Sequence, residues 1–152
     1  MATVEEEGYT YRHPRPMVTV DAVVFRRSAA GIEILLIRRG KPPFGEMYAL
    51  PGGFVDMEED LPDAAARELE EETGLKGIAL SQIGAFGAPG RDPRGRNISI
   101  AFLGWARGEG GDVRGGDDAD EARWFPVADL PPLAFDHGVI MEAALAAAGE
   151  GG

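Results

Sequence analysis

The sequence predicts a single α+β domain in which a mixed set of strands packs with two helices as a sandwich. Apolar, β-branched segments come first, a short charged helix follows, and further strands lead to a final helix, an order typical of mixed sandwiches. The chain has 152 residues, the size of one domain, and 44% of them are hydrophobic, which is enough for a core.

The first half of the chain carries the clearest strand pattern. Two runs of alternating or β-branched apolar residues are joined by a short turn, and a connection rich in proline and glycine follows them. The expected elements are strands at 17–25 and 32–38, a turn at 28–31, an extended piece at 48–50 within the connection 40–53, and a helix at 61–73.

The second half alternates apolar strands with polar loops and ends in a helix. The expected elements are a strand at 78–86, a polar loop at 88–97, a strand at 98–106, an acidic loop at 108–122, a strand at 123–127, a turn at 129–132 and a helix at 136–148. We expect an N-terminal arm over 1–16, one domain over 17–148, and a disordered tail over 149–152 that frays because it is rich in glycine.

Composition excludes several classes of protein. The chain has no cysteine, so it has no disulfides or thiolate metal sites; this suits a reducing compartment, and we expect a cytoplasmic protein. No apolar run resembles a secretory signal or reaches the roughly 18 residues of a transmembrane helix. The formal net charge of -11 argues against a nucleic-acid or membrane-surface binder, but a bound cation would still allow a small anionic ligand.

The boundaries of the helix at 61–73 are marked by the residues around it. Asp60 is a favourable N-cap, and Pro62 fits the first turn, where its missing N–H costs little. Gly74 follows the last helical residue, as a left-handed C-cap does. A tight turn at Gly52 and Gly53 is expected to open the stretch that contains this helix.

The charges on this helix indicate a metal site. At about 100° per residue, Glu68, Glu71 and Glu72 share one face, and Glu70 points away. Arg67 precedes Glu71 by four residues and can hold that carboxylate in place. A hard cation such as Mg²⁺ prefers oxygen ligands and keeps waters that phosphate oxygens can share. The alternative is an ordinary solvated helix face that is rich in glutamate. The fixed spacing of the glycines, the cap and the arginine argues against this alternative.

These residues resemble the Nudix box, which would span 53–75 in this chain. The matching residues are Gly53, Glu59, Arg67, Glu68, Leu69, Glu71, Glu72, Gly74 and Leu75. The resemblance implies a Nudix-type α/β/α sandwich with a mixed sheet. It also implies hydrolysis of a nucleoside diphosphate linked to another group, with Mg²⁺ as the cofactor and Mn²⁺ as a possible substitute.

The resemblance also implies a role for each box residue. Glu68 and Glu72 are expected to be metal ligands, Glu71 a ligand or the residue that orients water, the Gly53 carbonyl a further ligand, and Glu59 and Arg67 hydrogen-bonded supports. In this family the general base is often a Glu outside the helix, on a loop before the last strand. Asp118 is the first candidate for base or metal ligand here, followed by Asp117 and Glu121, with a solvated acidic loop as the alternative.

Segments outside the box resemble the ADP-ribose pyrophosphatase branch of the family. They lie at 19–25, 48–56, 90–102, 115–122 and 132–137, and Pro89 is a weaker marker. This resemblance implies that ADP-ribose is cleaved to AMP and ribose 5-phosphate. Other nucleoside diphosphate derivatives and oxidised nucleoside triphosphates are the alternatives.

The residues themselves are compatible with a nucleotide pocket. Three arginines of the polar loop form the densest basic cluster, and a guanidinium fork suits phosphate or ribose oxygens, although surface charge balance would also explain them. Aromatic residues flank the glycines and are candidates for stacking on adenine, with core packing as the more common role. The candidate substrate-binding residues are Arg38 (or its neighbour Arg39), Phe44, Tyr48, Phe54, Arg91, Arg94, Arg96 and His137. Asp136 is expected to cap the last helix.

A sensor of ADP-ribose-type ligands that regulates transcription is the alternative from another class. Such proteins carry a DNA-binding domain, and we expect none here because the chain ends soon after the helix at 136–148. The box is also intact, whereas a pure sensor can lose its carboxylates. The resemblance further implies a homodimer, to which the arm at 1–16 could contribute.

Overall fold

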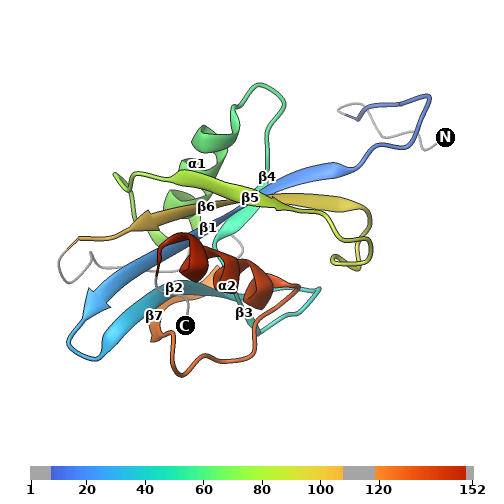
Figure 1. The fold of residues 1–152 in the computed structure, drawn as a ribbon. Helices are drawn as coiled ribbons and strands as arrows, with labels where there is room; N and C mark the ends of the chain where they lie inside the picture. The colour runs from blue at the N-terminus through green and yellow to red at the C-terminus, as the bar shows by residue number, and fades with distance from the viewer. Residues whose placement is uncertain (1–7, 108–118, 150–152) are drawn as a thin grey trace.

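The structure, a computed structural model, describes residues 8–107 and 119–149 and shows a twisted sheet with a helix on each side (Figure 1). The described strands are β1 (Met17–Ser28), β2 (Gly31–Arg39), β3 (Tyr48–Ala49), β4 (Gly52–Phe54), β5 (Ser81–Phe86), β6 (Asn97–Trp105) and β7 (Ala119–Pro126), and the helices are α1 (Leu61–Thr73) and α2 (His137–Ala147). None of the described helices is long and apolar enough to cross a membrane.

The strands form one mixed sheet. Its main path runs in the order β3-β2-β1-β6-β5, with β4 paired to β1 and β7 paired to β2. The long pair β1 and β6 is parallel, and the other named pairs are antiparallel. The central strand β1 therefore contacts β2, β4 and β6, which brings the glycines of β4 beside the middle of the sheet.

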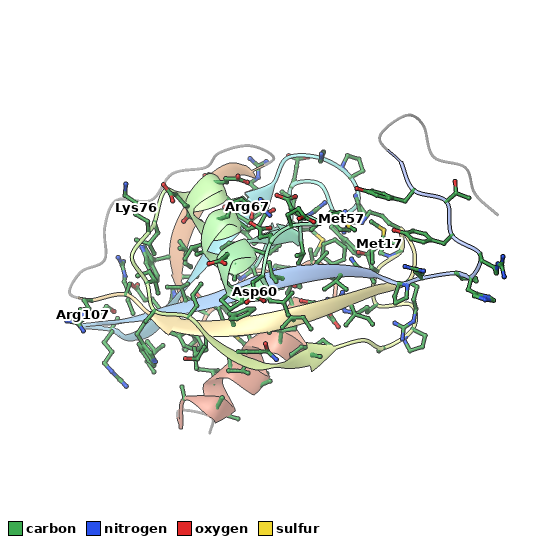
Figure 2. All side chains as sticks on the ribbon, turned by 90° about the horizontal axis from the view of Figure 1, so that it is seen from above. Met17, Met57, Asp60, Arg67, Lys76 and Arg107 are labelled. Atoms are coloured by element: carbon green, nitrogen blue, oxygen red, sulfur yellow. The ribbon has the colours of Figure 1, made fainter. Side chains whose placement is uncertain are left out.

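The core lies on both faces of this sheet, as alternation along β1 requires. Ala22 and Val24 belong to the cluster that includes Leu69 of α1, whereas Val23 and Phe25 pack with Ile140 of α2. Figure 2 shows α1 and α2 on opposite sides of the sheet. The α/β/α sandwich with a mixed sheet expected from the sequence is confirmed.

Several elements differ from the sequence-based expectation. β7 begins at Ala119 instead of residue 123, and β5 begins at Ser81 instead of residue 78. The predicted turn at Gly52 and Gly53 was wrong, because both glycines belong to β4, and neither has a positive φ. They are needed for close approach: a Cβ on Gly52 would lie 2.2 Å from the Val20 carbonyl, and one on Gly53 would lie 2.4 Å from Oε2 of Glu68.

The two helices begin in different ways. Asp60 caps α1 by accepting the Leu61 N–H at 2.8 Å, and Gly74 ends it with φ 78°, so the bounds and both caps of this helix are as predicted. Asp136 occupies the N-cap position of α2, but its side chain makes no cap hydrogen bond. The predicted cap was wrong because this carboxylate binds Arg91 instead. Residues 8–16 of the predicted arm contain no helix or strand.

Candidate active site

A pocket of about 380 Å³ opens between α1 with β4 on one side and the loop 87–96 with the start of α2 on the other. We call its two sides the box wall and the opposite wall. The box wall consists of Gly53, Arg67, Glu68, Glu71 and Glu72. The opposite wall consists of Arg91, Asp92, Arg94, Phe135 and His137.

Arg67 connects the carboxylates of the box wall. Its Nε and Nη2 donate to Glu59 at 2.6 and 2.8 Å. Its Nη1 donates to Glu68 at 3.0 Å and to Glu71 at 3.1 Å, and Nη2 also donates to the Phe54 carbonyl at 3.1 Å. Figure 2 shows Arg67 on the side of α1 that faces the segment carrying Met57. One planar guanidinium thus fixes α1 to the strand and loop before it.

The hydrogen bonds from Arg67 change the titration of both partners. They lower the pKa of Glu59 to about 2 against a smaller opposing effect of burial, and they raise the pKa of Arg67. Glu59 is therefore ionised throughout the neutral range, and it holds Arg67 where its remaining N–H groups reach the helix carboxylates.

Glu72 is the most buried carboxylate of the box wall. Its side chain accepts the Gly52 N–H at 2.8 Å, and the residue is 8% exposed. Burial raises its pKa to about 8; Glu68 and Asp21 add to the rise, and the Gly52 hydrogen bond opposes it. Burial therefore favours the protonated form of this carboxylate, and a bound cation would favour the ionised form.

The oxygen atoms around Gly53 fit a hard divalent cation. Within residues 8–107 and 119–149, no three acidic or histidine side chains already surround a common metal position. Glu68 is held by Arg67, and Glu72 by the Gly52 amide. The missing Cβ of Gly53 nevertheless lets the Glu68 carboxylate lie directly against the backbone, and carboxylate and carbonyl oxygens are the ligands that Mg²⁺ prefers.

On the opposite wall, each of two arginines has its own carboxylate. Arg91 donates Nε and Nη2 to Asp136 at 2.9 and 2.6 Å. Asp92 accepts the backbone N–H, Nε and Nη2 of Arg94 at 2.9, 3.0 and 2.7 Å, and the Asn97 amide at 2.9 Å. Burial alone would raise the pKa of Asp92, but these hydrogen bonds hold it well below its usual range.

His137 closes the pocket beside the sheet. Its Nδ1 accepts the Leu50 N–H at 3.0 Å, so the neutral ring carries its proton on Nε2, which lies 3.6 Å from Oδ1 of Asp21. Burial lowers the pKa of His137, although Asp21 and Asp136 oppose this. Asp21 also accepts a hydrogen bond from the Ser99 hydroxyl. His137 is thus a neutral donor fixed against the sheet.

Four of the predicted substrate-binding residues do not line the pocket. Arg38 pairs with Glu46 at 2.7 Å, and the next residue on β2, which projects to the other face, lines the pocket instead. Tyr48 packs against Phe125 and hydrogen bonds to Glu121. Phe44 packs edge-on against Phe135, and Arg96 offers its carbonyl to the N–H of Met17. The pocket does contain Phe54, Arg91, Arg94 and His137.

The pocket also contains residues that the sequence reasoning did not select. They include Asp21, Lys41, Asp92 and Phe135. Asp21 carried a usable signal, because an aspartate within an apolar strand is unusual unless it has partners. Arg39 was predicted as the alternative to Arg38, and strand alternation places Arg39, and not Arg38, in the pocket. Phe135 carried no signal, since it reaches the pocket through the turn before α2.

Only one of the three predicted loop carboxylates lies within the described residues. Asp117 and Asp118 lie outside the described residues. Glu121 is described, and its carboxylate accepts the Tyr48 hydroxyl and lies 3.9 Å from Nη1 of Arg123. It does not line the pocket.

The α/β/α fold and the box wall define the class of protein. The NUDIX domain family model matches residues 15–144, so the chain belongs to the Nudix family and is a Nudix hydrolase. Hydrolases of this family generally use divalent metals and bind small nucleotide substrates.

Three relatives connect the chain with ADP-ribose. It is 44% identical over 132 residues to the ADP-ribose pyrophosphatase of Methanocaldococcus jannaschii, which covers 87% of this chain and 73% of that protein. It is 40% identical over 93 residues to the ADPR responsive transcriptional repressor NtrR of Acinetobacter baylyi, which covers 60% of this chain and 37% of the repressor. The NUDIX domain of Shewanella oneidensis NrtR complexed with ADP ribose superposes with a TM-score of 0.83 at 28% identity, covering 96% of this chain and 99% of that chain.

Proposed function

We propose that the protein hydrolyses ADP-ribose to AMP and ribose 5-phosphate with Mg²⁺, for which Mn²⁺ can substitute. The observation that carries the proposal is that one pocket joins the acidic box wall to a wall of arginines and an aromatic ring. A diphosphate needs positive charge at its oxygens, and a nucleoside needs a planar apolar surface. The 44% identity to an ADP-ribose pyrophosphatase supports this choice of substrate.

In the proposed reaction, the box wall holds the metal. Glu68, Glu71, Glu72 and the Gly53 carbonyl are the oxygen donors that would bind it. Such a cation, when bound, neutralises phosphate oxygens and lowers the pKa of coordinated water. Arg67 keeps Glu68 and Glu71 oriented through its hydrogen bonds at 3.0 and 3.1 Å.

The residues of the chain then have defined tasks. Glu71 is the most exposed of the three box-wall glutamates, with 41% of its side chain exposed against 14% for Glu68, and it takes the proton of the attacking water. The water oxygen adds to one phosphorus, the bridging P–O bond breaks, and the released phosphate oxygen leaves with the second product. Arg39, the last residue of β2, and Lys41, two residues further on, bind the diphosphate oxygens during this attack.

A substrate panel tests the proposal. The protein is incubated with Mg²⁺ and ADP-ribose, nucleotide sugars, dinucleotides or oxidised nucleoside triphosphates, and kcat/KM is measured from product formation. We expect the highest value for ADP-ribose. A higher kcat/KM for any other member of the panel would replace ADP-ribose as the substrate without affecting the assignment to the family.

The similarity to an ADPR responsive repressor favours a second candidate, an ADP-ribose-binding protein that does not cleave its ligand. Tight binding of intact ADP-ribose, with no product in Mg²⁺ or Mn²⁺, would support this candidate. The homodimer and the cytoplasmic location stay predictions, and light scattering of the purified protein tests the first of them.

A further inference from the structure

Two segments that are far apart in the chain are joined beside the pocket by one ion pair. Arg91 contacts both carboxylate oxygens of Asp136, at 2.9 and 2.6 Å, and the Arg91 side chain is only 4% exposed. Asp136 stands at the N-cap position of α2, yet its side chain caps no amide. Its carboxylate therefore holds the loop 87–96 against the start of α2 instead of stabilising the helix end.

The segment on the Asp136 side carries an aromatic ring in an unusual conformation. Phe135 has φ 53°, in the left-handed region that bulky residues rarely adopt. Hydrogen bonds on both sides hold it there: the Ala134 N–H donates to the Tyr48 carbonyl at 2.8 Å, and His137 accepts the Leu50 N–H at 3.0 Å. A rare backbone conformation that its surroundings enforce is typical of functional sites.

The segment on the Arg91 side carries a planar cation. Asp92, which is 4% exposed, binds Arg94 through three N–H groups and so fixes the direction of its side chain. The guanidinium carbon of Arg94 lies 5.3 Å from the centroid of the Phe54 ring and 5.4 Å from that of Phe135. The Arg94 side chain is 42% exposed, so a ligand in the pocket can reach it.

We propose that Arg94, Phe54 and Phe135 form the subsite for the planar base of the nucleotide, and that the Arg91–Asp136 pair is a positioning element that sets the separation of Arg94 and Phe135. The inference rests on the proposed function for the identity of the nucleotide. It deepens that function by assigning the base to the place where Arg94 and Phe135 of the opposite wall meet Phe54, at the end of β4. Asp136 contacts no substrate in this arrangement, so it affects the affinity for base-bearing ligands and not the rate of the chemical step.

AMP and ribose 5-phosphate are matched probes for this subsite, because both carry a ribose and a phosphate monoester and only AMP carries a base. Calorimetric titration in Mg²⁺ compares the wild type with Asp136→Asn and Arg94→Gln. We expect each variant to bind AMP about tenfold more weakly, with ribose 5-phosphate affinity changed by less than about twofold. For ADP-ribose turnover, KM rises by a similar factor and kcat stays the same.

The control is Glu33→Gln, which removes a carboxylate from an ion pair with Arg26 at 2.7 Å, outside the pocket. It leaves AMP binding unchanged. In the Arg94→Gln background, Asp136→Asn causes less than about a further twofold loss, since the two residues act on one subsite. Arg91→Lys, which keeps the charge but loses the two-point contact, replaces Asp136→Asn if that variant does not fold.

Three results would overturn the proposal: an equal loss of AMP and ribose 5-phosphate binding, unchanged AMP binding in Asp136→Asn, or fully additive losses in the double variant. Because these titrations need no turnover, they are independent of the proposed reaction. A protein that binds AMP as described but does not cleave ADP-ribose would contradict the reaction and leave the base subsite in place.

Discussion

The two walls of the pocket hold their charges in different ways. On the box wall, Glu68 and Glu71 share the single guanidinium of Arg67 with Glu59, which lies outside the pocket. On the opposite wall, each of two arginines has a carboxylate of its own. The box wall therefore has fewer cationic groups than carboxylates, and burial, together with the charges of Glu68 and Asp21, raises the pKa of Glu72 to about 8. On the opposite wall, both arginines already form ion pairs before any ligand binds.

This difference indicates two separate tasks. A wall with excess negative charge gains from a cation and so suits the chemistry of a diphosphate. A wall whose arginines are fixed by buried or half-buried carboxylates presents a preformed shape, which suits recognition. Substitutions on the box wall should therefore reduce kcat, and substitutions on the opposite wall should raise KM.

The largest effect is expected from Glu72→Gln. The variant removes a charged oxygen donor from the proposed metal site, which corresponds to about 4 kcal/mol of transition-state stabilisation, or about a thousandfold in kcat. Glu70→Gln is the matched control, because it makes the same change on the exposed side of the same helix and should leave kcat unaltered. Equal activities of the two variants in Mg²⁺ would contradict the division of tasks.

Arg67→Lys should have the next largest effect. Lysine cannot reproduce the bidentate contact with Glu59 while it also contacts Glu68 and Glu71. We expect a loss of about 2 kcal/mol in the free energy of unfolding and about a tenfold to hundredfold loss in kcat. Urea denaturation and steady-state kinetics measure the two effects. Full activity with reduced stability would restrict Arg67 to a structural role.

Adjacent arginines of β2 offer a matched comparison within one strand. Arg39→Ala removes a cation that lines the pocket, and about a tenfold rise in KM for ADP-ribose is expected. Arg38→Ala removes a cation that pairs with Glu46 outside the pocket, and KM for ADP-ribose should change by less than about twofold. Steady-state kinetics with ADP-ribose give KM for both variants. A larger rise in KM for Arg38→Ala than for Arg39→Ala would contradict the assignment of Arg39 to diphosphate binding.

The smallest effect concerns the pH dependence of stability without metal. The pKa of Glu72, about 8, lies above its value in an unfolded chain, so its contribution is complete below the unfolded pKa and is lost as the pH rises through about 8. Glu59 does not interfere, since its pKa of about 2 means that its contribution is lost only in strong acid.

In EDTA, the free energy of unfolding should therefore fall by about 2 kcal/mol between about pH 5 and pH 8. Urea denaturation at each pH measures this fall. Glu72→Gln, which does not titrate, should lack it, and Mg²⁺ should restore the stability of the wild type at the higher pH. Identical pH profiles for the wild type and the variant would rule out Glu72 as the cause.

The same two walls show what the sequence could predict. The box wall is built within 53–75, and helix periodicity and caps place Arg67 and its glutamates together without knowledge of the fold. The opposite wall depends on Arg91 and Asp136, 45 residues apart, which only the tertiary structure brings together. This is why Asp136 was expected to cap a helix, and why Phe135 was not selected.

Backbone geometry explains the remaining differences. The glycines of β4 were expected in a turn, because a pair of glycines is usually a turn signal, whereas here they allow β1 and Glu68 to approach a strand. Arg38 and Arg39 were not distinguished, because the face that each presents depends on the position of β2 in the sheet. The sandwich architecture and the bounds of α1 could be predicted, because they depend on the local pattern of apolar residues and helix caps.

The central claim, metal-dependent cleavage in a pocket with two distinct walls, is tested most directly by product analysis. ADP-ribose is incubated with the protein in Mg²⁺ and, separately, in EDTA, and AMP and ribose 5-phosphate are quantified by chromatography. We expect equal amounts of the two products in Mg²⁺ and none above background in EDTA. Intact ADP-ribose bound to the protein in Mg²⁺ or Mn²⁺, with no AMP formed, would contradict it.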